Sequence, residues 1–248
     1  MTTNSANAGA GTHPTALSTR LYIGAVIAAG ALVLATFAPR EVPQPLLALT
    51  FLAAMIVVSL FKLRLPLGDG HSTMSMAYVV DFAVIATAGA DLAMVIAAIG
   101  VVVQCTVNVP RRQPWYRTAF SVATVVLAVR TAGLVWAGFG GTVAGASGLG
   151  AVAPLLAAAA PYFAINSGLV AAAIALSNGT SPIRCWLDNF LNTAPGVFAA
   201  AGMVAAVELT MTGDAYLLLA AVAAPAACCH LAYAAWFRRL APATLATV

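Results

Sequence analysis

The sequence predicts an all-α, polytopic integral membrane protein with about eight transmembrane helices. Hydrophobic residues make up 62% of the 248 residues and charged residues only 7%, whereas soluble domains carry roughly 25% charged residues. The mean hydropathy is +0.97. Apolar residues are gathered in runs of about 17 to 25 residues, the length that a helix needs to cross the hydrocarbon core. These observations assign the chain to a bilayer before any motif is considered.

Six apolar runs predict strong transmembrane helices, and two further runs predict weaker ones. The strong runs are Leu21–Ala38, Pro45–Phe61, Ala90–Val107, Thr118–Gly138, Val152–Leu176 and Ala215–Trp236. The weaker runs are Met74–Gly89, which is short and contains Asp81, and Ala194–Met211, which is rich in Ala and Gly and contains Glu208. Counting both weaker runs gives eight helices.

The basic residues support eight crossings with both termini in the cytoplasm, because Lys and Arg concentrate in short cytoplasmic loops. With eight crossings, the residues on the cytoplasmic side are Arg20, Lys62, Arg64, Arg111, Arg112, Arg117, Arg184, Arg238 and Arg239. Only Arg40 then lies outside, and Arg130 lies within a helix. We expect a disordered cytosolic tail over residues 1–20, one transmembrane domain over residues 21–240, and a short cytosolic tail over residues 241–248.

Several function classes are not expected. The net charge of +4 is explained by topology and by contact with anionic headgroups, and no basic, aromatic cluster predicts nucleic-acid binding. Recognised catalytic and phosphate-binding motifs are absent, so we do not expect an enzyme. Cys228, Cys229 and His230 are consecutive, so their side chains point about 100° apart on a helix. No second cluster completes a coordination sphere, and neither a metal nor another cofactor is expected.

Three ionisable residues fall inside predicted transmembrane helices: Asp81, Arg130 and Glu208. A charge near the bilayer centre costs several kcal/mol unless it faces protein, a partner charge or water. Counting residues along the helices places Asp81 near the midplane and Arg130 at a depth compatible with a salt bridge to it. Glu208 is a second candidate partner for Arg130. Two interpretations stay open, a structural clamp and a functional pocket.

Other polar residues at similar depth add candidates for such a pocket. Asn166 and Gln104 lie within apolar helices, although polar residues there more commonly join one helix to another. The candidate ligand-binding residues are Asp81, Arg130, Glu208, Asn166, Gln104 and Tyr78.

The predicted cytoplasmic loops contain more turn signals and more polar, basic and aromatic residues than the outer loops. Gly68-Asp69-Gly70 is a strong turn signal between two alternating segments and favours either a short re-entrant hairpin or an ordinary interfacial loop. Residues 183–192 alternate apolar and polar side chains at helical spacing, which suits an amphipathic helix in the interface or a plain connecting helix. The candidate partner-binding residues on this face are Arg111, Arg112, Arg117, Trp186 and Asn189.

Small residues recur at four-residue spacing in the first predicted helix, for example Gly24 with Ala28 and Ala31 with Ala35. Such faces let helices approach closely. They serve packing within the chain, or docking of a second copy or another partner.

Motifs spread over residues 21–240 resemble a family of bacterial membrane sensors. The first half carries Leu65-Pro66-Leu67-Gly68, Ser72, Ser75, Tyr78, Asp81, Phe82, Gln104-Cys105-Thr106, Arg111-Arg112, Tyr116-Arg117 and Phe120. The second half carries Tyr162-Phe163, Asn166, Trp186, Asn189-Phe190, Ala194-Pro195, Pro225, Leu231, Tyr233 and Trp236. These residues resemble the MASE-like sensor modules that precede GGDEF or HD-GYP domains in bacterial cyclic-di-GMP signalling proteins.

The resemblance implies a multi-pass sensor or input module in the bacterial cytoplasmic membrane. In that family the last helix continues into a cytosolic output domain, whereas this sequence ends at Val248. We therefore expect output through a separate cytosolic signalling protein. The expected signal is small or lipophilic and is recognised near Asp81 and Arg130.

Two other functions stay open at this level. The region between Leu67 and Gln104 also looks like the substrate-binding membrane components of energy-coupling-factor vitamin transporters, which typically have six helices. The third alternative is a structural or assembly subunit of the membrane in which the buried charges act as clamps.

Overall fold

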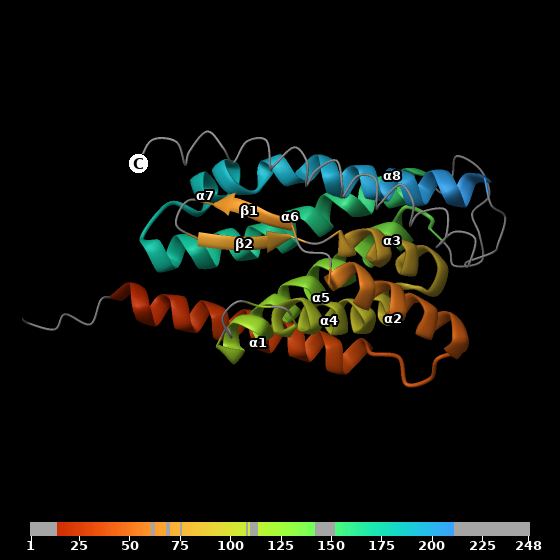
Figure 1. Ribbon diagram of the computed structural model, residues 1–248, viewed down its shortest axis with the longest axis horizontal. Coiled ribbons are helices and arrows are strands. Elements are labelled where there is room, and N and C mark those ends of the chain that lie inside the picture. The colour runs from red at the N-terminus through yellow and green to blue at the C-terminus, as the bar shows by residue number, and fades with distance from the viewer. Residues whose placement is uncertain are drawn as a thin grey trace, which may run out of the picture.

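The computed structural model describes residues 14–60, 63–67, 70–74, 76–107, 109, 114–141 and 152–210. The chain forms a bundle of antiparallel helices with one β-hairpin (Figure 1). In chain order the elements are α1 (Pro14–Phe37), α2 (Pro45–Leu60), β1 (Leu63–Leu67), β2 (Gly70–Met74), α3 (Ala77–Ala88), α4 (Ala90–Thr106), α5 (Trp115–Gly138), α6 (Val152–Asn178), α7 (Pro182–Asn189) and α8 (Ala194–Thr210).

The prediction of a multi-pass helical membrane protein is confirmed in its coarser form. Four helical segments are long and apolar enough to cross a bilayer: Leu17–Phe37, Trp115–Gly138, Val152–Asn178 and Pro182–Val207. The predicted last helix, Ala215–Trp236, lies outside the described residues. Eight crossings and cytoplasmic termini stay predictions.

From α1 to α6 successive helices run in opposite directions, and α7 begins where α6 ends, so α1, α5 and α7 begin at the same end of the bundle (Figure 1). Arg20, Arg117 and Arg184 lie in or near the first turns of these helices. We call this end the basic end. The predicted topology makes it the cytoplasmic end.

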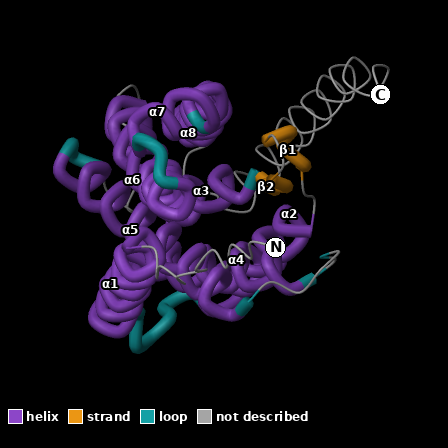
Figure 2. Tube along the Cα trace, turned by 90° about the vertical axis from the view of Figure 1, so that its left-hand side faces the viewer, coloured by secondary structure: helices purple, strands orange, loops and turns teal. Residues whose placement is uncertain are grey.

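Helix α3 is the centre of the bundle. Nine consecutive residues, Tyr78 to Ala86, are buried, and a helix that is apolar on every side belongs in a core rather than on a surface. Helices α2, α4 and α8 pack directly against it. Seen along the bundle axis, α3 lies between α8 on one side and α4 on the other (Figure 2). The largest fully buried side chains near α3 include Phe51, Phe82, Ile85 and Met94.

The chain changes from helix to strand after α2 and from strand to helix before α3, partway along the bundle. At 1.5 Å per residue, the 16 residues of α2 and the 12 residues of α3 span about 24 and 18 Å, less than the roughly 30 Å of hydrocarbon. The antiparallel hairpin β1–β2 pairs Leu63 with Met74 and Leu67 with Gly70. It continues α2 and α3 toward the basic end (Figure 1). Apart from this short hairpin the described elements are helices, so the all-α prediction is confirmed in its coarser form. The predicted helix Met74–Gly89 is shortened to Ala77–Ala88, because residues 70–74 pair as strand β2.

Glycines set the closest helix contacts. A Cβ on Gly30 of α1 would lie 2.5 Å from the Cβ of Ala123 in α5, and one on Gly133 of α5 would collide with Ala90 of α4. Gly89 alone joins α3 to α4, with a φ of 87°, a conformation that L side chains rarely adopt. Small residues thus pack α1 and α4 against α5.

Three further expectations change. Helix α1 begins at Pro14, so residues 14–20 are helical rather than part of a disordered tail. The repeated small residues of α1, including Gly24 and Ala28, are exposed and do not pack inside the chain. Helix α7 runs along α6 and continues through a 3₁₀ turn, Leu191–Thr193, toward α8. It is therefore the first part of the apolar segment Pro182–Val207 and not a separate interfacial helix.

We expect Gly30→Ala to destabilise the protein by about 1–3 kcal/mol, because the new methyl group would overlap Ala123 in a packed contact. Gly24→Ala is the matched control on the same helix, since a Cβ there would meet nothing within 4 Å. It should leave stability unchanged or raise it by up to about 1 kcal/mol. Unfolding of the purified protein in detergent, followed by circular dichroism, measures both. Equal stability of the two variants would contradict the α1–α5 contact.

Candidate functional site

The candidate site is a buried carboxyl group at the centre of the bundle. Asp81 lies in the second turn of α3 and is 2% exposed. Tyr162 of α6 donates its hydroxyl proton to Oδ2 of Asp81 over 2.6 Å. Among the described residues, Oδ1 of Asp81 has no hydrogen-bond partner. One oxygen is therefore satisfied across the bundle, and the other remains available.

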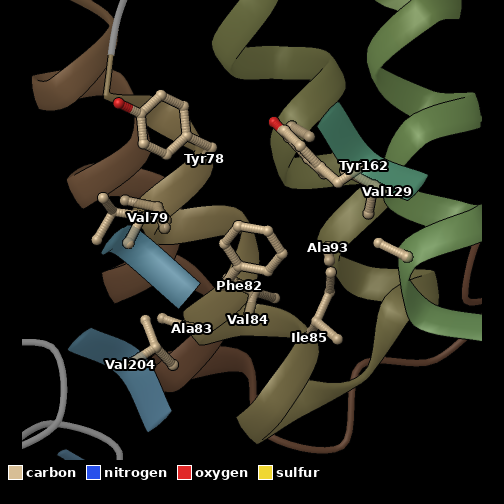
Figure 3. Close-up of a cluster of buried hydrophobic side chains, with 14 of the residues drawn as sticks. Tyr78, Val79, Phe82, Ala83, Val84, Ile85, Ala93, Val129, Tyr162 and Val204 are labelled. Carbon is tan, nitrogen blue, oxygen red and sulfur yellow. The ribbon is translucent and has the colours of Figure 1, made fainter. Parts of the chain in front are cut away.

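The surroundings of this pair are apolar. The ring of Phe82 lies 5.2 Å from the ring of Tyr162, centroid to centroid. Figure 3 shows Tyr78, Phe82 and Tyr162 among aliphatic side chains from several helices. No ion pair to Asp81 is formed within the part of the chain that the structure describes. A carboxyl group in such a place is costly as an anion, and a donor or cation that reached Oδ1 would stabilise it.

Tyr78 lies one turn before Asp81 on α3, at the contact with α8. Its hydroxyl donates to Sδ of Met76 over 3.3 Å. A Cβ on Gly196 would lie 2.9 Å from the Tyr78 hydroxyl oxygen, so the start of α8 fits closely over this side chain. The predicted residue Tyr78 is thus near the Asp81 centre and holds α8 against α3.

Arg130 does not belong to this centre. Its Nη1 donates to Oδ1 of Asp91 over 2.6 Å, with side-chain exposures of 21% for Arg130 and 52% for Asp91. The Arg130 guanidinium carbon also lies 3.8 Å from the centroid of the Phe37 ring, a cation–π contact. The salt bridge that the depths of Asp81 and Arg130 allowed is not formed. Arg130 pairs instead with Asp91 in the first turn of α4.

The other predicted ligand residues are scattered. Glu208 lies in α8, and its side chain is outside the described part of the structure. Asn166 of α6 and Gln104 of α4 are both partly buried. The hydrogen bonds of Asp81 and Arg130 in the described part of the chain go to Tyr162 and Asp91 instead. The structure therefore does not assemble the predicted set into one pocket.

The predicted partner-binding residues divide in the same way. Arg111 and Arg112 lie outside the described residues, and Arg117 is exposed at the start of α5. Trp186 turns inward: its indole N–H donates to Oγ of Ser167 over 2.7 Å, and its ring lies 5.7 Å from that of Phe163. Asn189 donates to the Cys185 carbonyl over 2.8 Å. Trp186 thus packs α7 against α6 and Asn189 bonds within α7, and a partner-binding role for either residue stays a prediction.

Tyr162 and Asp91 are the two site residues that sequence reasoning missed. Tyr162 lies among Ala, Pro and Phe, and its one local signal is that a buried tyrosine hydroxyl usually finds a polar partner. Asp91 follows Gly89 at the start of α4, where a carboxylate favours the helix N-terminus. Neither signal predicts the partner, which is Asp81 on α3 for Tyr162 and Arg130 on α5 for Asp91.

Neither a search for metal ligands nor comparison with known proteins assigns a function to this site. Within the described residues, no three His, Cys, Asp or Glu side chains gather closely enough to hold a metal ion. No family model, curated protein or solved structure matches the chain. The site has to be interpreted from its own chemistry.

Tyr162→Phe should destabilise the protein by about 2 kcal/mol, since a buried carboxyl group would lose its donor. In an Asp81→Asn background the same change should cost about 1 kcal/mol or less, because an amide tolerates the loss better. Tyr22→Phe is the matched control, as the Tyr22 hydroxyl donates to the neutral carbonyl of Leu169. A double-mutant cycle on unfolding free energy measures the coupling, and additive effects of the Asp81 and Tyr162 changes would refute it.

Asp91→Asn should cost about 0–1 kcal/mol, as expected for an exposed ion pair. Arg130→Gln should cost somewhat more, because it also removes the contact with Phe37, worth about 0.5–1 kcal/mol at such sites. Combining Arg130→Gln with Asp81→Asn should give additive losses within about 0.5 kcal/mol, since the two side chains share no partner. Unfolding free energies of the single and double variants decide this. If the double variant recovered the stability lost by the singles, Asp81 and Arg130 would interact after all.

Proposed function

We propose that this protein is a membrane-embedded input module that recognises a small ligand at Asp81 and passes the change to a separate cytosolic partner. The observation that supports this most strongly is Oδ1 of Asp81, which is buried and without a partner among the described residues. An ionisable residue inside a membrane helix is a functional candidate by default. The ligand class that suits this atom is a small molecule with a positive charge or a hydrogen-bond donor.

The closed geometry favours a sensor over a simple binding protein. Asp81 is 2% exposed, so a ligand reaches Oδ1 only if α3 or a neighbouring helix moves. Binding is then linked to a conformational change, which is what a two-state input requires. The Asp81–Tyr162 hydrogen bond is the contact that distinguishes the two states, because it joins α3 to α6.

The hairpin gives a route for the change to reach the basic end. Strand β2 ends at Met74 and α3 begins at Ala77, so a displacement of α3 is passed directly to β2. The resemblance to MASE-like sensor modules is consistent with output on that side. A separate cytosolic signalling protein is the partner that this proposal requires.

Transport of a small molecule is the second candidate. It is favoured by the two crossings that change from helix to strand, because non-helical backbone at membrane depth lines a water-filled cavity or is covered by protein. Broken crossings of this kind are common around transporter sites. A transporter would use Asp81 to hold its substrate midway.

Native mass spectrometry of the protein gently extracted from its own membranes tests the proposal. We expect the wild-type protein to carry a discrete small molecule that is lost from Asp81→Asn. Asp91→Asn is the matched control, since it removes a carboxylate that is paired with Arg130 and 52% exposed. This control variant should retain the molecule.

Identical, ligand-free spectra for wild type and Asp81→Asn would contradict the proposal and make Asp81 a structural residue. If a molecule is found, uptake into vesicles that contain the purified protein separates the two candidates. Accumulation of the molecule inside the vesicles would establish transport, whereas binding without accumulation supports the sensor.

A further inference from the structure

An apolar groove opens on the side of the bundle where α1 meets α4 and α5. Its volume is about 520 Å³. Ile27, Ala31 and Leu34 of α1 form one wall, and Val102, Ala119 and Val122 line the rest. None of the predicted ligand residues lines it, so it is distinct from the Asp81 centre.

The groove has one polar end. Thr106 is the last residue of α4 and Trp115 the first residue of α5, and both line it. Trp115 is 77% exposed. Tryptophan is enriched at the level of lipid headgroups, so this end of the groove lies at the interface and the remainder extends toward the hydrocarbon.

A basic residue continues the same face of α1. Arg20 is exposed and precedes Ile27 by seven residues, two helical turns, so both lie on one face of α1 about 10 Å apart along the axis. Ala31 and Leu34 extend this face away from the basic end. Arg20 thus matches the phosphate of a lipid, Trp115 the boundary below the headgroups, and the apolar groove an acyl chain.

We propose that this groove holds one acyl chain of an anionic phospholipid whose phosphate contacts Arg20. A guanidinium binds phosphate oxygens through charge-assisted hydrogen bonds. The groove opens beside α1, which is mostly exposed and which the fold places at the edge of the bundle (Figure 2). The lipid therefore enters sideways from the leaflet at the basic end, and no movement of α3 is needed.

The test uses the full chain in nanodiscs made of equal amounts of phosphatidylglycerol and phosphatidylcholine, followed by native mass spectrometry of the released protein. We expect one retained phosphatidylglycerol. Ala31→Phe, which fills the groove, should lower its occupancy about tenfold. Ala29→Phe is the matched control, because Ala29 is also exposed on α1 but does not line the groove, and it should retain the lipid.

Arg20→Gln tests the headgroup contact separately. It should lower the preference for phosphatidylglycerol over phosphatidylcholine about fivefold, the effect of one basic residue near the membrane surface. Equal lipid occupancy in the wild-type, Ala31→Phe and Ala29→Phe proteins would overturn the proposal, as would a wild-type protein that retains no lipid. An unchanged headgroup preference in Arg20→Gln would overturn the phosphate contact.

Discussion

The structure depends on the burial of α3, a helix of 12 residues that carries a carboxyl group. Every residue from Tyr78 to Ala86 is buried, so the helices around α3 are arranged to exclude lipid from all its sides. Asp81 is tolerated at this position because Tyr162 reaches it from α6. A buried carboxyl group with one donor is expensive, and evolution of a purely structural core would favour an apolar side chain of similar size. The position of Asp81 is therefore the strongest argument for function in this molecule.

The charges of the bundle serve two separate purposes. Arg130, Asp91 and Phe37 form a partly exposed contact that ties α1, α4 and α5 together at the end opposite the basic end. Such a contact contributes little free energy, but it orients three helices whose packing is otherwise set by small residues such as Gly30 and Gly133. Asp81 has a different environment, with no described cation. Arg130 is thus held in an ion pair between helices, whereas the functional interpretation of Asp81 is our proposal.

The hairpin connects the buried centre with the basic end. Helices α2 and α3 are shorter than the roughly 30 Å of hydrocarbon, and the chain extends each of them toward the basic end with a strand, β1 or β2. Strands satisfy only part of their backbone hydrogen bonds within a two-stranded hairpin, so this part of the bundle requires cover from protein or water. Strand β2 leads into α3 with only two residues between them, and the proposed link from Asp81 to the basic end rests on this connection.

The sequence by itself determined the membrane class, the approximate positions of the described helices and the placement of Asp81 inside an apolar helix. Apolar runs and the scarcity of charge are local properties, and they do not depend on which helices meet. The turn signal at Gly68-Asp69-Gly70 indicated the hairpin as one of two alternatives, since turn chemistry is also local. The depth of a residue along its helix was accessible by counting, but two residues at compatible depth are not necessarily neighbours.

Only the tertiary structure decided the partners. Arg130 bonds to Asp91 and Asp81 to Tyr162, because helix packing sets which faces meet, and no spacing along the chain encodes that choice. Trp186 points toward Ser167 rather than outward for the same reason, since the amphipathic pattern of α7 identifies its apolar residues without saying which of them contact α6. The groove beside α1 likewise exists only where three helices leave a space between them. Contacts between helices far apart in sequence depend on how the whole bundle closes, and that is a property of the folded chain.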